Sequence, residues 1–317
     1  MNRDSKILII GHNDAIENAL LNYFQKNKYP HIFSSSFLKL DFLNPKRFFD
    51  FLKKKRPDYV FLGSIRSGGI AANQKFAAEF IYENLESQNN VIHASYKFGV
   101  KKLLFFAASC VYPKECPQPM KEEYLLTGSL EETGEPYSVA KIAGVKLCQI
   151  YKKQYGFNAI VAVPATIYGP GSDMDFETAH VLGALIGKFQ KAMRQGQREV
   201  VVWGSGRPRR EFLFTEDFVQ AGLFLMDHYN DANLINVGCG FDVSIKELAF
   251  LIKKISGFKG KIIFDPTKPD GTMKKLMDNS RILKLGWKAQ VSLEEGITQT
   301  YKWYSKLREM RDVRRDV

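Results

Sequence analysis

KILIIGHNDAIENAL, residues 6–20, contains an uninterrupted apolar run that ends at a glycine and continues into a helical pattern. Lys6–Ile10 predicts a buried strand. Asp14–Lys26 predicts a helix, because its apolar side chains recur every three to four residues. A strand that is apolar on both faces is typical of a parallel sheet covered by helices on both sides. This stretch therefore predicts the first strand, turn and helix of an α/β fold.

Apolar runs and amphipathic helical patterns alternate in the same way to about residue 170. The pair Asn44-Pro45 marks one helix start, because asparagine caps helices and proline is tolerated in the first turn. The other predicted strands are His31–Ser34, Tyr59–Leu62, Lys102–Ala108 and Ala159–Val163, and the other predicted helices in this region are Ala77–Phe98 and Pro136–Tyr155. Strands that alternate with helices predict a Rossmann-type doubly wound parallel sheet.

The character of the sequence changes after about Gly169, where glycine, proline and charged residues become denser. We expect a Rossmann-type domain over residues 1–170, with a returning segment at about 211–245. Residues 171–210 and 246–317 would then form a smaller mixed α/β domain, which includes a predicted helix at Val181–Arg194. This domain is expected to close over the carboxyl ends of the strands, where ligands bind in open α/β sheets.

The 317 residues carry a net charge of +12, from 46 Lys+Arg against 34 Asp+Glu. The basic residues are scattered and no nucleic-acid-binding signature accompanies them, so we expect no nucleic-acid partner. No apolar run approaches the roughly 20 residues that span a bilayer, and the N-terminus lacks a signal-peptide pattern. The four cysteines show neither CxxC pairing nor metal-ligand spacing. These features predict a cytoplasmic protein with reduced thiols, no bound metal and no membrane partner.

Tyr137 and Lys141 lie four residues apart in the predicted helix Pro136–Tyr155, so their side chains share one face. A lysine ammonium beside a phenol favours the phenolate and lowers the pKa of a tyrosine. Such a phenol can donate or accept a proton near neutral pH. The pair follows a predicted buried strand, and this setting makes it a candidate for acid–base chemistry.

The segment ASCVYPKECPQPMKEEYLLTGSLEETGEPYSVAKIAGVKLCQIYKKQYG, residues 108–156, resembles the extended short-chain dehydrogenase/reductase family. Residues 67–84, 165–171, 201–218, 235–240 and 268–278 share this similarity, which is weakest in about the first 60 residues. Within that family the chain is similar to enzymes that epimerise and then reduce a GDP-4-keto-6-deoxy sugar, a hexose or a heptose. The resemblance implies a GDP-sugar substrate, NADP(H) as cofactor and a homodimer.

The resemblance also implies roles for individual residues. Cys110 and His180 match a pair that moves protons at the carbons flanking the ketone, and Tyr137 and Lys141 match the pair that serves reduction. A proton next to a ketone is acidic enough for a thiolate or an imidazole to remove, and inversion needs an acid and a base on opposite faces. Taken singly, Cys110 is better explained as a small buried hydrophobe and His180 as an ordinary helix-start residue, and their joint placement in the matching motifs is what favours the catalytic role.

Binding residues follow from the same resemblance. Lys188, Trp203 and Arg210 match substrate-binding positions, although the family has an arginine where Lys188 stands, and Trp203 is equally well explained by core packing. The positions that match the cofactor site are Gly11, Asn13, Asp14, Ala108, Tyr137, Lys141 and Pro164.

The chain departs from the family pattern at several cofactor and catalytic positions. Asp14 and Glu17 replace the second and third glycines of the phosphate-binding turn, whose small size normally admits a pyrophosphate. Asp14 is expected to take the place of that phosphate or to turn aside, and Glu17 to point away. No arginine that could hold a 2′-phosphate occurs in residues 33–41, where Lys39 is the nearby cation.

The serine that would hold the carbonyl falls on Ala108. The adjacent Ser109 is the candidate for the missing catalytic hydroxyl. Neighbouring strand residues point to opposite faces, so Ser109 can take this role only with a local shift of the backbone. Thr166 also stands where the family has asparagine.

Three functions stay open from the sequence: an epimerase/reductase, an epimerase that has lost reduction, and a catalytically silent sugar-nucleotide-binding protein. The departures affect mainly hydride transfer and its cofactor, and none removes Cys110 or His180. Epimerisation needs no nicotinamide, so use of NADP(H) separates the first function from the second, and proton transfer at the sugar separates both from the third.

Overall fold

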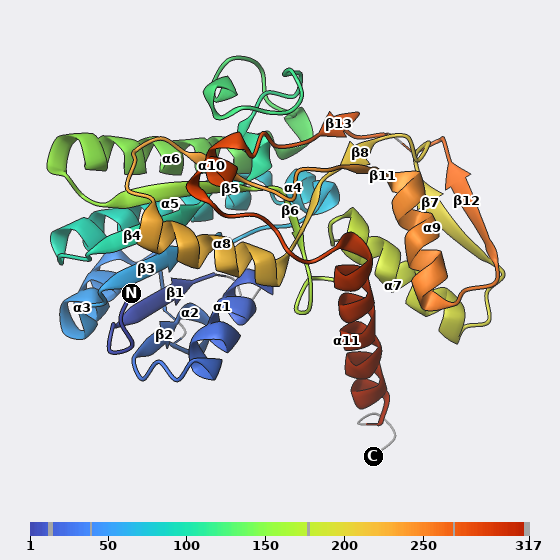
Figure 1. The fold of residues 1–317 in the computed structure, drawn as a ribbon, viewed down its shortest axis with the longest axis horizontal. Helices are drawn as coiled ribbons and strands as arrows, with labels where there is room; N and C mark the ends of the chain where they lie inside the picture. The colour runs from blue at the N-terminus through green and yellow to red at the C-terminus, as the bar shows by residue number, and fades with distance from the viewer. Residues whose placement is uncertain (12–14, 39, 176–177, 269, 314–317) are drawn as a thin grey trace.

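The computed structural model describes residues 1–313 except 12–14, 39, 176–177 and 269. Its central sheet has six parallel strands in the order β10-β5-β4-β3-β1-β2 (Figure 1). The strands are β1 (Ile7–Ile10), β2 (Ile32–Ser34), β3 (Tyr59–Leu62), β4 (Lys102–Phe106), β5 (Ala159–Pro164) and β10 (Ile235–Val237). The predicted doubly wound parallel sheet is therefore confirmed.

Helices cover both faces of this sheet. One face carries α1 (Ala15–Lys26) and α8 (Thr215–His228), and the other carries α3 (Pro45–Lys55), α5 (Ala77–Lys97) and α6 (Glu135–Tyr155). The predicted start of α3 is confirmed, since the Asn44 side chain accepts a hydrogen bond from the Arg47 amide. The strand order changes direction at β1, which has β2 on one side and β3 on the other. Ligands bind at such a switch point, outside the carboxyl ends of the strands.

One predicted strand is shorter than expected, and this affects the candidate site. The predicted strand Lys102–Ala108 ends at Phe106. The Ala107 amide still donates to Ala162, but the Val111 amide then donates to Ala108 at 3.1 Å and closes a 3₁₀ turn, η1 (Ser109–Val111). The alternation of a strand therefore no longer decides which way Ala108 and Ser109 face.

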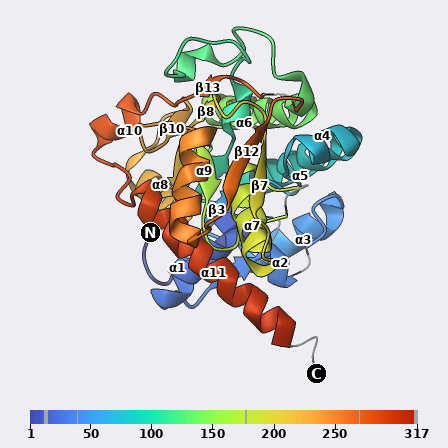
Figure 2. The same cartoon turned by 90° about the vertical axis from the view of Figure 1, so that its right-hand side faces the viewer.

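The remaining elements form a second lobe, short elements that pack on the sheet lobe, and the connections between the two (Figures 1 and 2). The helices are α2 (Ser35–Leu38), α4 (Ile70–Lys75), α7 (Val181–Arg194), α9 (Ile245–Ser256), α10 (Ser280–Leu285) and α11 (Leu293–Val313), with 3₁₀ turns η2 (Glu122–Tyr124) and η3 (Glu132–Gly134). The strands are β6 (Thr166–Tyr168), β7 (Glu199–Trp203), β8 (Arg209–Arg210), β9 (Phe212–Phe214), β11 (Val243–Ser244), β12 (Lys261–Asp265) and β13 (Lys274–Lys275). Strand β7 pairs with β12, and β8 pairs with both β11 and β13.

Two clusters of buried apolar side chains support the division into two lobes. The larger cluster surrounds the six-stranded sheet, and the smaller one packs α7, α9 and α11 together with β7. Met277, Ile282 and Trp287 belong to the larger cluster, so residues 277–287 pack against the sheet lobe although they follow residue 246 in the chain. The boundaries given above for the two domains stay a proposal.

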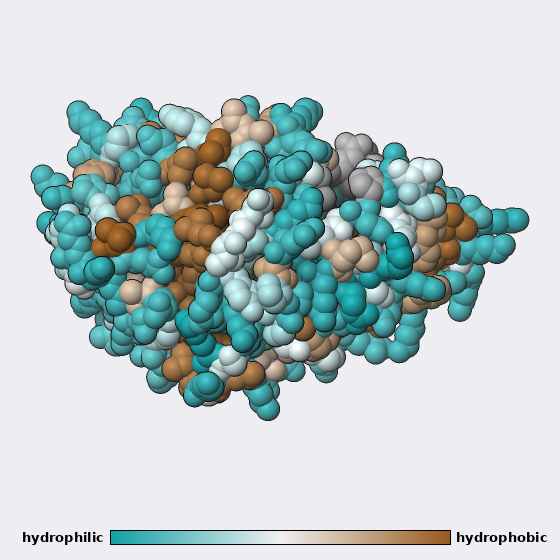
Figure 3. Space-filling view, turned by 90° about the horizontal axis from the view of Figure 1, so that it is seen from above, coloured by the Kyte–Doolittle hydropathy of each residue, from teal (hydrophilic) through white to brown (hydrophobic). Residues whose placement is uncertain are grey.

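The surface and the helices show two further features. Seen from above, hydrophobic side chains form a band across the lobe that holds the large sheet (Figure 3). Within the described residues, no helix combines the length and the apolar character needed to cross a membrane.

Candidate functional site

The candidate site lies at the carboxyl edge of the sheet, where helix α6 presents Tyr137 and Lys141 from its first two turns. The helix packs close to the sheet at Gly144, where an added Cβ would lie 2.5 Å from the Phe105 ring. A larger residue at this position would push α6 away from β4, because side-chain packing in protein interiors leaves little space. Gly144 therefore helps to fix Tyr137 and Lys141 relative to the strand ends.

Lys141 is buried, with only 1% of its surface exposed. Its Nζ donates a hydrogen bond to the Phe106 carbonyl at 2.8 Å and lies 4.5 Å from the centre of the Phe105 ring. The same Nζ is 5.9 Å from the centre of the Tyr137 ring. The structure therefore brings the predicted pair together on one face of α6.

The phenol of Tyr137 has a partner that the sequence analysis did not identify. Its hydroxyl lies 2.7 Å from the Ser64 Oγ, in the loop that follows β3. Its ring meets the Phe80 ring edge to face, with the ring centres 6.2 Å apart. Ser64 and Tyr137 are 73 residues apart in the chain, so no local pattern indicates this contact.

Cys110 lies half-buried in the 3₁₀ turn that follows β4. Burial raises the pKa of its thiol, while a hydrogen bond with Ser138 and the charges of Lys275 and Lys141 offset part of that rise. The thiol is therefore protonated at neutral pH and has two ammonium groups near it that favour its thiolate. Such a group can give up a proton and regain one.

His180 is the N-cap residue of α7, yet its side chain makes no capping hydrogen bond. Solvent reaches this side chain, but the surrounding protein is dense enough for burial to lower the pKa of the imidazole. The Asp173 carboxylate opposes this shift, and the charge of Lys275 adds to it. The imidazole is therefore neutral at pH 7 and can accept a proton.

Lys275, on β13, is a second residue that the sequence analysis missed. Its charge acts on both Cys110 and His180, and burial lowers the pKa of its own ammonium group. Glu211 holds this strand in place, because its buried carboxylate accepts a hydrogen bond from the Met277 amide at 2.8 Å. Residues 268–278 carried part of the family resemblance, but a two-residue strand has no periodicity that could place Lys275 at the site.

The side chain of Glu17 does not point away as expected, and this prediction was wrong. Glu17 is 1% exposed, and its carboxylate lies at the end of β2. It accepts hydrogen bonds from the hydroxyls of Ser34, Ser35 and Ser36 at 2.6, 2.9 and 2.6 Å and from the Ser36 amide at 3.1 Å. Serines in the stretch 33–41 thus bind a carboxylate of the protein itself.

Gly11 ends β1 and packs directly against Glu17. An added Cβ on Gly11 would lie 2.9 Å from the Glu17 Cβ and 3.2 Å from its Oε2. The Gly11 amide donates to the Ser35 hydroxyl at 3.1 Å. The glycine thereby gives the Glu17 side chain room to reach the end of β2.

Three residues considered in the sequence analysis, Asn13, Asp14 and Lys39, lie outside the described residues. Pro164 is the buried last residue of β5, and its edge of the sheet is the one that carries the candidate site. Ala108 and Ser109 are both half-buried at the turn beside α6.

A dinucleotide would find a different environment at each end of this crevice. At the reactive end the described residues fit such a group, since Tyr137, Lys141 and Ser64 meet where the strands end. At the other end, the Glu17 carboxylate is buried at the end of β2 among the hydroxyls of Ser34 and Ser35. The described residues therefore fit the reactive end of the cofactor.

Trp203 and Lys188 lie together on the second lobe. Trp203 is 56% exposed at the end of β7, which excludes core packing as its role. The Lys188 Nζ lies 5.1 Å from the centre of its ring and donates to the Val201 carbonyl at 2.9 Å, and the Lys268 Nζ lies 5.5 Å from the ring centre. An exposed aromatic ring between two ammonium groups can stack on a base and bind an anion.

Arg210 lies half-buried on β8, beside the strand that carries Lys275. Its Nη1 donates to the carbonyls of Arg209 and Thr272, so the guanidinium is held in place. Thr166 begins β6, and its amide donates to the Glu211 carbonyl at 3.2 Å. The predicted substrate residues Lys188, Trp203 and Arg210 come from three different elements, α7, β7 and β8. Arg210 adjoins Lys275, because β8 pairs with β13.

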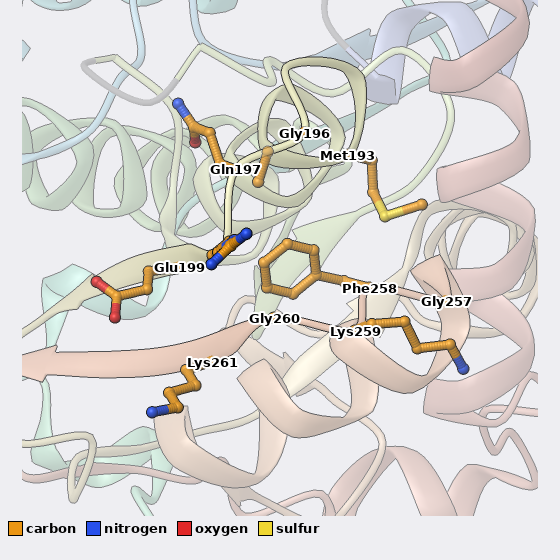
Figure 4. Close-up of a pocket in the computed structure, with 11 residues that line it drawn as sticks. Met193, Gly196, Gln197, Glu199, Gly257, Phe258, Lys259, Gly260 and Lys261 are labelled. Atoms are coloured by element: carbon orange, nitrogen blue, oxygen red, sulfur yellow. The ribbon is translucent and has the colours of Figure 1, made fainter.

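A hollow of about 600 Å³ lies elsewhere, at the far end of α7 (Figure 4). Met193, Gly196, Phe258 and Lys261 line it together with seven other residues, and none of the predicted site residues contributes. Among the residues that the structure describes, no group of three or more His, Cys, Asp or Glu side chains is arranged to hold a metal ion.

Comparison with known proteins gives a family match and several relatives. The NAD dependent epimerase/dehydratase family matches residues 7–238. GDP-L-fucose synthase 1 of Arabidopsis thaliana is 45% identical over 304 residues, which cover 96% of this chain and 94% of that protein. GDP-L-fucose synthase of Escherichia coli K12 is 40% identical over 308 residues, with 94% and 96% covered.

Solved structures are similar over nearly their full length. A GDP-6-OMe-4-keto-L-xylo-heptose reductase from Campylobacter jejuni superposes with a TM-score of 0.91 at 36% identity, covering 97% of this chain and 99% of that one. A GDP-L-fucose synthetase from Naegleria fowleri, in a structure bound to NADP, gives a TM-score of 0.88 at 28% identity, with 98% and 95% covered.

Proposed function

The chain belongs to the NAD dependent epimerase/dehydratase family, and we propose that it epimerises and reduces a GDP-4-keto-6-deoxy sugar with NADP(H). The resemblance seen in the sequence motifs is confirmed by relatives that cover nearly the whole chain. Both the GDP-L-fucose synthases and the heptose reductase are named for GDP-sugar chemistry, which supports a GDP-sugar as substrate.

One observation carries the proposal of a combined activity. The Cys110 thiol is close enough to both Lys141 and Lys275 for their charges to affect its pKa, and Lys275 also acts on His180. Cys110 also lies in η1, which packs against α6, the helix that carries Tyr137 and Lys141, so a residue proposed for epimerisation lies beside those proposed for reduction. A single bound sugar can meet both sets without leaving the site.

We propose the following division of roles. His180, neutral at pH 7, accepts a proton from a carbon next to the ketone, and the Cys110 thiol on the opposite face donates one, so that the centre inverts. Tyr137 then donates its proton to the ketone oxygen, and Lys141 supports the phenolate that remains. NADPH, when bound, supplies the hydride for the carbon. Lys188, Trp203 and Arg210 are proposed to hold the GDP part.

The test is incubation of the protein with GDP-4-keto-6-deoxymannose in D₂O, with and without NADPH. Deuterium at C3 and C5 together with NADPH oxidation and a reduced product supports the proposal. Deuterium uptake without oxidation supports the epimerase alone. Binding of the GDP-sugar with neither reaction would contradict both enzymatic proposals for this substrate.

The epimerase alone is kept as a second proposal because of one feature, the buried Glu17 carboxylate. Its negative charge and its position at the end of β2 disfavour the phosphates of a dinucleotide. The NADP-bound Naegleria structure supports binding of NADP(H) by the family, and Glu17 is expected to weaken that binding in this chain.

Replacing Glu17 with glutamine is expected to tighten NADPH binding about fivefold, because about 1 kcal/mol of charge repulsion is removed at an intermediate effective dielectric. The amide oxygen of glutamine can still accept hydrogen bonds from the serines, so the fold is expected to persist. Titration calorimetry with NADPH measures the change. Glu309→Gln on α11 is the control, because it removes one negative charge far from the proposed site. Equal affinities for NADPH in the wild type and Glu17→Gln would contradict the prediction.

We also propose a homodimer that forms through α5 and α6. Tyr82 on α5 and Val139 and Ile150 on α6 expose large apolar side chains, and the two helices pack side by side on one face of the sheet. Light scattering coupled to size exclusion should give twice the mass of 36.2 kDa for the wild type and a lower mass for Ile150→Glu. A wild-type monomer at micromolar concentration would contradict this proposal.

The proposed acid–base role of Cys110 needs a reduced thiol. All four cysteines are free in the structure, and the cytoplasm keeps thiols in this state. We therefore propose the cytoplasm as the site of action.

A further inference from the structure

The loop after β3 carries a hydroxyl that directly meets the proposed catalytic phenol. The Ser64 Oγ lies 2.7 Å from the Tyr137 hydroxyl, and Ser64 itself is half-buried at the carboxyl edge of the sheet. At this distance the two hydroxyls share one hydrogen bond, in which either oxygen can be the donor.

The backbone around Ser64 is held at both ends. The Gly63 amide donates to the Ile10 carbonyl at 2.8 Å, and an added Cβ on Gly63 would lie 2.9 Å from that oxygen, so the close approach requires glycine. The amides of Ile65 and Arg66 both donate to Asn84 Oδ1, at 3.2 and 3.3 Å. Ser64 thus lies between a residue pinned to β1 and two residues pinned to α5.

Helix α5 fixes the loop and the tyrosine together. Asn84 is 2% exposed, and its amide nitrogen donates to the carbonyls of Arg66 and Phe80. The Arg66 guanidinium donates two hydrogen bonds to the Glu83 carboxylate, at 2.7 and 2.9 Å. One turn before Asn84, the Phe80 ring packs edge to face on Tyr137. The Ser64–Tyr137 contact is therefore built by a rigid element.

We propose that Ser64 is the positioning residue for the Tyr137 phenol in carbonyl reduction. This inference rests on the proposed reductase function. Reduction adds a hydride from NADPH to the ketone carbon and a proton from Tyr137 to the ketone oxygen, and the dinucleotide is oxidised. For Tyr137 to aim its proton at the ketone, the shared hydrogen bond must be donated by Ser64.

The same hydrogen bond matters after the proton has left. The Tyr137 phenolate can only accept, and the Ser64 hydroxyl then donates to a charged oxygen, which makes the bond stronger than one between neutral groups. The developing negative charge is thus stabilised by a donor that was already in place. Ser64 follows β3, so it performs this role from the end of a different strand than β4, after which Ala108 offers no hydroxyl.

Ser64→Ala is the test variant, and reduction of GDP-4-keto-6-deoxymannose by NADPH is the assay. We expect kcat to fall about tenfold, the value of one typical hydrogen bond, with KM little changed. We also expect the loss of rate at high pH to move to higher pH, because a phenol without this donor holds its proton more tightly. Ser64→Thr keeps the hydroxyl and should restore both rate and pH profile.

Ser67→Ala, an exposed serine in the same loop, is the matched control and should leave reduction unchanged. A Ser64→Ala enzyme with the wild-type rate and pH profile would overturn the proposal if Tyr137→Phe is inactive in the same assay. If the wild type itself reduces nothing, the proposed function fails, and the phenolate absorbance near 295 nm still tests Ser64. Subtracting the titration of Tyr137→Phe isolates the absorbance change that belongs to the Tyr137 phenol. This change should occur at higher pH in Ser64→Ala than in the wild type. An unshifted titration would overturn the proposal.

Discussion

Replacing Cys110 with serine is expected to slow inversion of the sugar's stereocentres by 100-fold or more. Removal of one acid–base group from such a step costs two to four orders of magnitude. A serine hydroxyl is a far weaker acid than a thiol, and Lys141 and Lys275 do not bring it into a useful range. The change preserves the size of the side chain at a half-buried turn, so the fold should tolerate it. Inversion is measured by NMR in D₂O without NADPH.

The pH dependence gives an independent check on the same residue. Burial raises the pKa of the Cys110 thiol and lowers that of the His180 imidazole, so at neutral pH the thiol is the acid and the imidazole the base. Inversion should therefore rise as the imidazole loses its proton and fall again as the thiol ionises at high pH. The high-pH limb should be absent in Cys110→Ser.

Cys116→Ser is the control, because Cys116 is also half-buried and the charge of Lys275 also lowers the pKa of its thiol, against the rise caused by burial. This variant should invert the sugar at the wild-type rate. Deuterium exchange without inversion in Cys110→Ser would identify His180 as the base. Inversion at the wild-type rate in that variant would remove Cys110 from the mechanism.

Local sequence patterns were enough for the fold and for one half of the site. Buried strands and amphipathic helices have short periods, so β1, β5 and α6 appear in the sequence close to their observed limits. Tyr137 and Lys141 are four residues apart on one helix, and their proximity follows from helix geometry alone. The end of β4 was less predictable: the strand stops at Phe106 and not at Ala108, since pairing partners decide where a strand ends.

The features that the sequence did not reveal all depend on distant contacts. Ser64 meets Tyr137 across 73 residues, and Lys275 reaches the site on a strand of only two residues. Glu17 was expected to point away because it lies one turn further along the predicted helix than Asp14, yet its carboxylate is buried, which is costly for a charged group. Its partners, three consecutive serines at the end of β2, offset that cost by satisfying the buried charge. None of these contacts leaves a periodic signal.

Tyr137→Phe is expected to reduce the rate of ketone reduction by about 1,000-fold while inversion of the stereocentres continues. The phenol is the proposed proton donor to the ketone oxygen, and loss of a positioned general acid costs 100- to 10,000-fold. Cys110 and His180 need no phenol, so inversion should keep its rate. The ring still packs on Phe80, and the hydrogen bond to Ser64 is lost. NADPH oxidation and inversion are followed on the same sample.

Tyr151→Phe is the matched control, because it removes a comparable hydrogen bond from the same helix. The Tyr151 hydroxyl lies 2.7 Å from the His93 Nδ1, whereas the proposed chemistry uses Tyr137 near the other end of α6. Equal losses of reduction in the two variants would mean that the effect comes from the stability of α6. A loss confined to Tyr137→Phe, with inversion intact, would separate the two halves of the reaction and assign the reductive half to the phenol. Reduction at the wild-type rate in Tyr137→Phe would show that another group protonates the ketone, and the proposed role of Ser64 would fall with it.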